Sequence, residues 1–394
     1  MTALIVPPEP RLDWKALRWG RRKVELPPPF NITPTHYMFS GRTAIYHGLG
    51  ALEISAGQSV LVPAFHCASL VDPILRRGAT AAFYRVNPDC SPDFDDIRRR
   101  VDATTRAIVA IHYFGFPQPL GRFRELCAER GLYLIEDCAH VLAGRSESTT
   151  LGATGDISIF SWRKFLPLYD GGQLVVNNRA LAIDIKWDRP GFVARVKAVK
   201  DVFDRLVNDS PTALARYINH LERLPSIVGR YLQSKRARPG RSPIAMNSGA
   251  RFDLGFPFTM VNLPMSAFSR FVVDHIDLQS IVARRRFNYV HLLRTLGSLS
   301  GVIPLFPDLP DGVCPLAFPF FVEGRKDFHL RLRSFGLPAS TWGNVIHPDL
   351  PLEEFPDSRT LYDKLIYLPV HQSLTMEEMS TMGHAMQEAL FQTP

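Results

Sequence analysis

The sequence predicts an α/β fold, in which a mostly parallel central sheet is flanked by helices and a smaller α+β domain follows. Two patterns support this prediction. From residue 40 to residue 136, short apolar runs alternate with amphipathic segments, which is the pattern of repeated βα units. Beyond residue 250 a mixed set of helices and strands replaces this alternation. A chain of 394 residues is long enough for two domains.

Three regions follow from the pattern. Residues 1–35 are rich in proline and basic residues and are expected to form an N-terminal arm on the surface of the body. Residues 36–250 form the large domain, and residues 251–394 the small C-terminal domain. In the large domain we expect strands at 59–65, 81–86, 106–114, 132–135, 157–162 and 173–176, and helices at 40–54, 67–78, 94–101 and 119–131.

In the small domain, residues 262–296 have the apolar spacing of one long helix or two. A strand is expected at 314–323 and a helix at 325–336. A final helix opens at Thr375, because Thr375 and Glu378 have the spacing of a capping box.

The composition is that of an ordinary globular protein, with 46% apolar and 21% charged residues. Five cysteines occur, an odd number with no C-x-x-C pair, so no closed disulfide framework is expected. The N-terminus has no basic segment before its short apolar run, and no stretch approaches 18 apolar residues. We therefore expect a cytoplasmic protein without a membrane span.

The positive charge is concentrated in one segment. Residues 186–241 contain 13 Lys and Arg but only 5 Asp and Glu, and this local excess equals the net charge of +8 of the whole chain. The segment has helical apolar spacing and is longer than an ordinary connection. It is either a solvated helical face or a surface that attracts an anionic substrate, membrane or nucleic acid.

Residues 131–178 hold the candidate site. Asp137 closes one predicted strand and Lys164 follows another, and the carboxyl ends of parallel strands are where sites form in such sheets. Taken alone, Lys164 reads as a surface lysine, Asp137 as a helix N-cap, and Ser40 as the N-cap of the helix it opens. Taken together, they match pyridoxal 5′-phosphate (PLP), which requires a lysine amine, a carboxylate for its ring nitrogen and a helix N-terminus for its phosphate.

The motifs and their order resemble the DegT/DnrJ/EryC1/StrS family of PLP-dependent sugar aminotransferases, of fold type I. The resemblance covers about residues 36–180 and 255–380. It rests on SGRTA (40–44), GQSVLVPAFHCAS (57–69), RAIVAIHYFG (106–115), IEDCAH (135–140), GDISIFS (155–161), Lys164 with DGG (170–172), and LPVHQSL (368–374).

The resemblance implies a role for each matching residue. Lys164 would form the Schiff base with PLP and move the substrate proton, and Asp137 would pair with the ring nitrogen. His140 stands where the family usually has Gln, beside the ring and its 3-hydroxyl. The phosphate would be bound by Gly41, Arg42, Thr43 and Ser161. Asn262 matches an Asn that reaches the cofactor phosphate of the partner subunit, so a homodimer is implied.

The chain departs from the family pattern in two further places. Ser161 lies three residues before Lys164 instead of five, although the spacing from Lys164 to Gly171 is the usual one, so the loop before the lysine is shorter by two. Cys67 stands where an aromatic residue usually stacks on the ring, and His66 precedes it. Either residue could cover the ring.

Other histidines are weaker candidates. His112 ends a strand on the catalytic side but is more simply explained as a satisfied polar residue. His347 and His371 fall in the small domain, which borders the substrate pocket in the family. The sequence shows no metal-ligand spacing, so no metal site is expected.

The resemblance implies an aminotransferase that moves an amino group from an amino acid, glutamate or glutamine, to a keto group of a nucleotide-linked sugar or related precursor. Two alternatives stay open. One is a PLP-dependent dehydratase, or other PLP chemistry, on a non-sugar substrate. The other is a non-catalytic protein on the same fold that binds anions or nucleic acid through its basic segment. The presence of Lys164 and Asp137 together disfavours this second alternative.

Overall fold

The computed structural model describes residues 6–11, 26–31, 34–146, 149–190, 258–342 and 346–391. A seven-stranded sheet forms the centre of the large domain, in the order β1-β9-β8-β5-β4-β2-β3. Its strands are β1 (Thr35–Met38), β2 (Ser59–Pro63), β3 (Thr80–Tyr84), β4 (Thr105–Ile111), β5 (Tyr133–Cys138), β8 (Ile157–Ser161) and β9 (Gly172–Val176).

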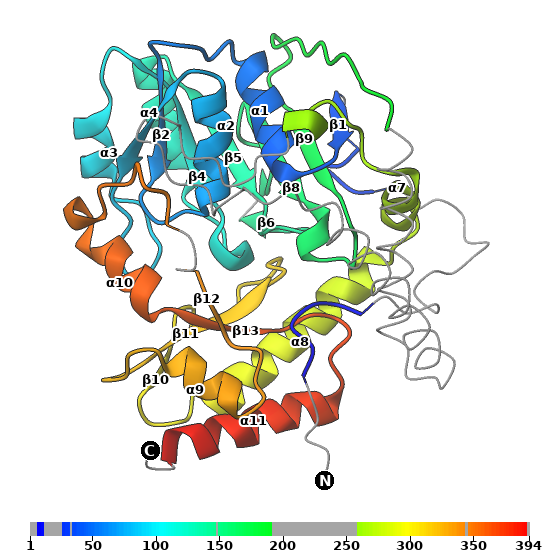
Figure 1. The fold of residues 1–394 in the computed structure, drawn as a ribbon, viewed down its shortest axis with the longest axis vertical. Coiled ribbons are helices and arrows are strands. Elements are labelled where there is room, and N and C mark those ends of the chain that lie inside the picture. The colour runs from blue at the N-terminus through cyan, green and yellow to red at the C-terminus, as the bar shows by residue number, and fades with distance from the viewer. Residues whose placement is uncertain are drawn as a thin grey trace, which may run out of the picture.

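Five neighbouring strands of this sheet, from β3 to β8, run parallel. At one edge, β9 runs antiparallel to β8, and β1 runs antiparallel to β9. The parallel strands are almost wholly buried, as expected when both faces of a sheet are covered. The helices that pack around it are α1 (Gly41–Ala51), α2 (Val71–Arg76), α3 (Phe94–Arg100) and α4 (Leu120–Arg130), as Figure 1 shows. The predicted α/β class is confirmed.

The second sheet, in the lower half of Figure 1, is antiparallel and has the order β10-β11-β13-β12. Its strands are β10 (Val302–Pro304), β11 (Ala317–Val322), β12 (Ser340–Thr341) and β13 (Ile366–Pro369). The helices of this half are α8 (Leu278–Leu296), α9 (Phe328–Ser334), α10 (Pro356–Lys364) and α11 (Met376–Phe391). A small α+β unit therefore follows the large sheet, as expected.

Residues 262–296 form two helices, because α7 (Ala267–Asp274) ends before α8 begins. The capping box of α11 is present: the Glu378 N–H donates to Thr375 Oγ1, and the Thr375 N–H donates to the Glu378 carboxylate. The domain boundary at 250/251 lies outside the described residues, as does nearly all of the basic segment, of which only residues 186–190 are described. Both stay predictions.

The predicted C-terminal end of the strand at 106–114 is wrong. β4 stops at Ile111, and residues 113–115 form a short 3₁₀ turn in which Phe114 has a φ of 55°. The carboxyl end of β4 therefore turns sharply, and its last residues line the site edge.

The N-terminal arm, in the parts that the structure describes, contributes side chains to the core. Val6, Leu26 and Phe30 are buried. The Phe30 ring lies 4.9 Å from that of Phe160 and 4.8 Å from that of Trp162. The arm thus completes the core beneath the end of β8.

Two further observations bear on the composition. All five cysteines are free thiols, four of them buried and Cys67 exposed. Among the described helices, none combines the length and apolar character that crossing a membrane requires.

Candidate active site

The candidate site is formed by residues at the carboxyl ends of β5 and β8. Asp137 is the fifth residue of β5, and Lys164 ends a 3₁₀ turn, Trp162–Lys164, that directly follows β8. Because β5 and β8 are neighbouring parallel strands, Asp137 and Lys164 come to the same edge of the sheet. The structure therefore brings together the two residues on which the prediction depended.

The electrostatic state of this pair follows from its burial. Burial raises the pKa of Asp137, and the nearby charge of Lys164 and a hydrogen bond from the Ala139 N–H oppose this only in part. Burial lowers the pKa of Lys164, although the negative charges of Cys67 and Asp137 act to raise it. A buried acid beside a half-buried lysine, each disfavoured in its charged form, is typical of a functional site.

His140 completes this group. Its side chain is buried, and Nδ1 accepts a hydrogen bond of 3.2 Å from the Phe114 N–H. Burial and the nearby Lys164 hold the pKa of His140 well below its usual range, so the ring is neutral. With Nδ1 accepting, the proton is on Nε2, which is available to donate.

The start of α1 is the candidate phosphate site, and its N-cap prediction is confirmed. Ser40 Oγ accepts from the Thr43 N–H, and the Ser40 N–H donates to Thr43 Oγ1. The Thr43 hydroxyl also donates to Ser40 O at 2.7 Å. The Thr43 hydroxyl is therefore committed to the cap, and the part of Thr43 in phosphate binding stays a prediction.

Gly41, Arg42 and Ser161 remain as the candidate phosphate ligands. A Cβ placed on Gly41 would lie 3.9 Å from the Cβ of Ser161, so the start of α1 and the end of β8 are adjacent. Arg42 is half-buried in the first turn of α1. Backbone N–H groups of a helix start beside a serine hydroxyl form a natural anion site.

The structure separates the roles of His66 and Cys67. The His66 ring is fully buried and stacked on Phe83, and its Nδ1–H donates to Pro63 O at 2.9 Å. Cys67 is exposed and close enough to Lys164 to affect its pKa. The expectation that His66 covers a cofactor ring therefore does not fit, because its ring belongs to the core.

Asn262 lies in a turn before α7, half-buried, and its carbonyl accepts from the Asp188 N–H at 3.0 Å. The following residue, Leu263, accepts from the Phe39 N–H, so this segment runs beside the residues that lead into the Ser40 cap. One chain alone does not test a contact to a partner subunit.

His347 and His371 are buried polar residues of the small domain. His347 Nε2 lies 3.8 Å from the Asp72 carboxylate of α2. His371 Nε2 donates to Pro7 O at 3.0 Å, in the N-terminal arm. Both therefore join segments of the structure, and neither has a described contact with Lys164.

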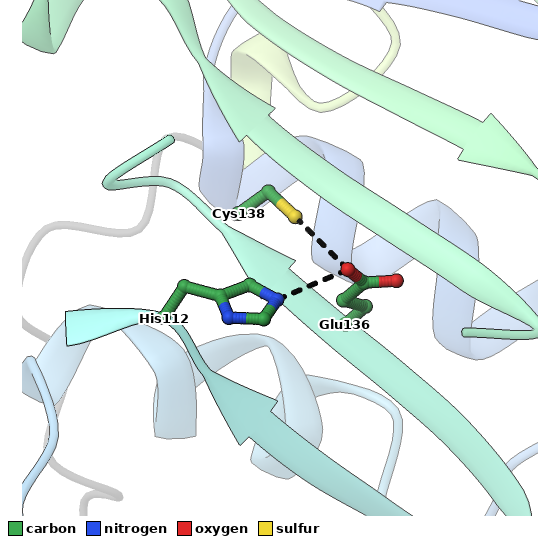
Figure 2. A group of neighbouring side chains, drawn as sticks. All are labelled: His112, Glu136 and Cys138. Atoms are coloured by element: carbon green, nitrogen blue, oxygen red, sulfur yellow. Dashed lines mark hydrogen bonds and ion pairs between the residues drawn. The ribbon is translucent and has the colours of Figure 1, made fainter. Parts of the chain in front are cut away.

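His112, Glu136 and Cys138 approach one another closely enough to suggest a metal site (Figure 2). Hydrogen bonding argues against it. His112 Nδ1 accepts from the Gln118 N–H at 3.0 Å, and Nε2 donates to Glu136 at 3.0 Å. Neither ring nitrogen has a free lone pair for a metal.

Sequence reasoning missed the residues that hold the site from the small domain. Trp342 contacts the ring of His140, with 4.8 Å between centroids. Arg285 and Gln372 both bond to the carbonyl of Phe165, the residue after Lys164. Gln372 lies within the LPVHQSL motif, which was the only sequence signal for any of them.

The fold and the site together define an α/β protein with a buried acid and a half-buried lysine at the edge of a mostly parallel sheet. Residues 37–207 match the model of the DegT/DnrJ/EryC1/StrS aminotransferase family. The match supports the resemblance seen in the motifs over this part of the chain.

Curated relatives support the same relationship. The chain is 30% identical to GDP-perosamine synthase of Vibrio cholerae over 194 residues, which are 48% of this chain and 53% of the relative. It is 28% identical to dTDP-4-dehydro-2,3,6-trideoxy-D-glucose 4-aminotransferase of Saccharopolyspora spinosa over 211 residues, 49% of this chain and 54% of the relative. The chain thus spans about half the length of the curated relatives it matches.

Solved structures agree in fold. PseC of Helicobacter pylori, an aminotransferase involved in the biosynthesis of pseudoaminic acid, superimposes with a TM-score of 0.65 and 16% identity over 98% of both chains. The aminotransferase TlmJ from Streptoalloteichus hindustanus gives a TM-score of 0.61 and 20% identity, over 90% of this chain and 85% of that one. At these identities the likeness establishes the fold alone, that of fold-type I aminotransferases.

Proposed function

We propose that this protein is a PLP-dependent aminotransferase that acts on a keto group of a nucleotide-linked sugar or a related precursor. The observation that supports this most is the convergence of Asp137 and Lys164 at one sheet edge, with opposite pKa shifts caused by burial. When bound, PLP supplies an electron sink for the substrate carbon that carries the amino group.

The residues present fit this cofactor. Asp137 is a buried carboxyl whose pKa is raised, because its described partners offset the cost of burying its negative charge only in part. A protonated ring nitrogen would supply the missing positive charge. The start of α1 beside Ser161 offers N–H and hydroxyl donors for a phosphate. Gly41, Arg42 and Ser161 would hold the phosphate, and Asp137 the ring nitrogen.

Lys164 would hold the cofactor through its amine and carry the substrate proton. Its lowered pKa increases the fraction of neutral amine at neutral pH, and only that form is a nucleophile or a base. His140, with its proton on Nε2, would donate a hydrogen bond to the 3-oxygen of the ring. Cys67, exposed beside Lys164, replaces the usual stacking aromatic.

The choice of acceptor rests on the relatives. The names of these relatives contain GDP-, dTDP- or UDP-linked sugars, and one is an L-glutamine:2-deoxy-scyllo-inosose aminotransferase. We infer an amino-acid donor, glutamate or glutamine, and a keto-sugar acceptor. Two half-reactions in one site predict ping-pong kinetics. A homodimer in which Asn262 reaches the partner's phosphate site is part of this proposal.

The test uses purified protein loaded with PLP. Lys164→Ala is expected to abolish both the visible absorbance of lysine-bound PLP and the turnover of L-glutamate. Lys364→Ala, at an exposed position on α10, is the matched control and should retain both. An unchanged absorbance band in Lys164→Ala would refute the role of this lysine.

The same experiment separates the alternatives. Conversion of PLP to its amino form on addition of L-glutamate or L-glutamine argues against a dehydratase. A chain that binds no PLP but binds nucleic acid with steeply salt-dependent affinity would instead be the non-catalytic protein.

A further inference from the structure

Arg285, in the middle of α8, is a cation in the interior of the protein. Its side chain is only 1% exposed. Nε donates to Gln372 Oε1 at 2.9 Å, Nη1 to the carbonyls of Pro315 and Leu316 at 3.3 and 3.2 Å, and Nη2 to the carbonyl of Phe165 at 3.4 Å. All of these acceptors are neutral, so among the described residues no carboxylate bonds to this guanidinium.

Such an arrangement is costly for stability alone. Burial lowers the pKa of Arg285 to about 10, so the group is still charged at neutral pH. A buried charge without an opposite charge is held only by its hydrogen bonds, and an apolar side chain of similar volume would pack there without this cost. The presence of Arg285 at this position is therefore explained by a role that requires the several N–H donors of a planar guanidinium.

That use is found at the carbonyl of Phe165, the residue that follows Lys164. This oxygen accepts from Arg285 Nη2 and from Gln372 Nε2, the latter at 2.8 Å. Arg285 also lies over the buried Phe165 ring, with Cζ 4.7 Å from the centroid. The peptide that joins Phe165 to Leu166, one residue beyond Lys164, is therefore held by side chains from outside the turn.

The turn itself offers little support. It is a single 3₁₀ turn, Trp162–Lys164, held by the Phe165 and Leu166 N–H groups, which donate to Trp162 O at 3.0 and 2.9 Å. Short 3₁₀ turns have poorer hydrogen-bond geometry than α-helix. Because the loop before Lys164 is shortened by two residues relative to the family pattern, the direction of the lysine depends on contacts from other segments.

We propose that Arg285 and Gln372 are positioning residues for Lys164. They hold the Phe165 carbonyl, and so fix the direction and the burial of the Lys164 amine at the site edge. Both residues come from the small-domain half of the chain. The packing of that half against the large sheet therefore determines the direction of the Lys164 side chain. The inference concerns the same site as the proposed aminotransferase function and rests on it for the catalytic consequence.

The test compares Arg285→Lys, Gln372→Leu and the double variant. Arg285→Lys keeps the charge but removes the fork, and Gln372→Leu alters a half-buried residue that the fold tolerates more readily. Arg286→Lys is the matched control, because the neighbouring Arg286 also donates to carbonyls, those of Pro310 and Val313, and not to Phe165.

The first readout needs no cofactor. The apo protein is labelled with acetic anhydride across a range of pH, and mass spectrometry follows Lys164 to give its pKa. In Arg285→Lys and Gln372→Leu, we expect this pKa to rise toward the ordinary lysine value as the amine gains solvent. In Arg286→Lys, the pKa of Lys164 should equal that in the unmodified chain.

The second readout is the half-reaction of the PLP-loaded protein with L-glutamate. Its saturating rate is expected to fall about 10- to 100-fold in each single variant, with the apparent L-glutamate affinity within about threefold. Because both residues act through one carbonyl, the double variant should lose less than the product of the single losses.

An unchanged Lys164 pKa in folded Gln372→Leu, or losses that multiply independently, would overturn the inference. If the chain bound no PLP, the proposed function would fail, while the labelling of the apo protein would still decide the positioning role.

Discussion

His112 Nε2 donates to Glu136 Oε1 at 3.0 Å, and both side chains are fully buried (Figure 2). The Glu136 carboxylate also accepts the N–H groups of Gly152, Thr154 and Gly155. Burial alone would raise the pKa of Glu136, but the hydrogen bonds from His112 and these N–H groups outweigh it, so the pKa is lowered. This buried anion holds the loop after β7 (Thr149–Thr150) against β5, the strand that carries Asp137.

Glu136→Gln is expected to destabilise the protein by about 2–4 kcal/mol. The amide NH₂ that replaces one carboxylate oxygen would face backbone N–H donors, and it cannot accept from them. Urea unfolding at pH 7 measures the effect. Glu125→Gln, at an exposed position of α4, serves as control and should change the free energy of unfolding by less than about 0.5 kcal/mol. Equal stability of the two variants would contradict the role assigned to Glu136.

His66 makes the stability depend on pH. Burial lowers its pKa to about 4, from 6.5 in an ordinary histidine, although the hydrogen bond to Pro63 O opposes this. The folded state thus resists protonation that the unfolded chain accepts. Its contribution is complete above pH 6.5 and is lost as the pH falls toward 4, up to about 3 kcal/mol.

His66→Phe should therefore lower stability at pH 7, through the lost hydrogen bond, yet flatten the decline between pH 6.5 and 4. Urea titrations at pH 7, 5.5 and 4.5 give the slopes for the variant and the unmodified chain. His371, whose pKa burial also lowers to about 4, keeps part of the slope in the variant. Parallel slopes would show that His66 is not a source of the dependence.

Much of the fold was predictable because its signals are local. Apolar runs between glycine and proline breaks placed six strands of the large sheet, and the capping-box pattern placed the start of α11. The short edge strands β1 and β10 and the helix α10 were missed, since each is formed by pairing or packing with distant residues. The burial of Phe30 in the arm was missed for the same reason.

The residues of the site likewise divide into those with a local sequence signal and those without one. Lys164 and Asp137 were predictable because each directly follows or ends a strand, and strand order brings them together. His66 was misjudged because the packing of its ring against Phe83 and its hydrogen bond to Pro63 are visible only in three dimensions. Arg285 lies 121 residues beyond Lys164 on another domain's helix, and no spacing rule connects them.

Gly115 is a contact point between the two halves of the protein. Its φ is +92°, which side chains rarely adopt, and a Cβ there would lie 2.4 Å from Cys314 O and 3.0 Å from His140 O. Both atoms belong to backbone, which cannot swing aside. The neighbouring Leu316 N–H donates to Phe114 O at 2.8 Å, so the two backbone segments are held close together here.

Gly115→Ala is therefore expected to lower the free energy of unfolding by about 3 kcal/mol or more, and to weaken PLP binding because His140 must shift. Gly121→Ala in α4 is the control: a Cβ there meets nothing within 4 Å, and replacing a helical glycine should stabilise the protein by about 0.5–1 kcal/mol. Urea unfolding and PLP titration report the two effects. If Gly115→Ala lost less than 1 kcal/mol, the close approach of the Cys314 carbonyl would not be a constraint on the fold, and the two halves would seat independently of this glycine.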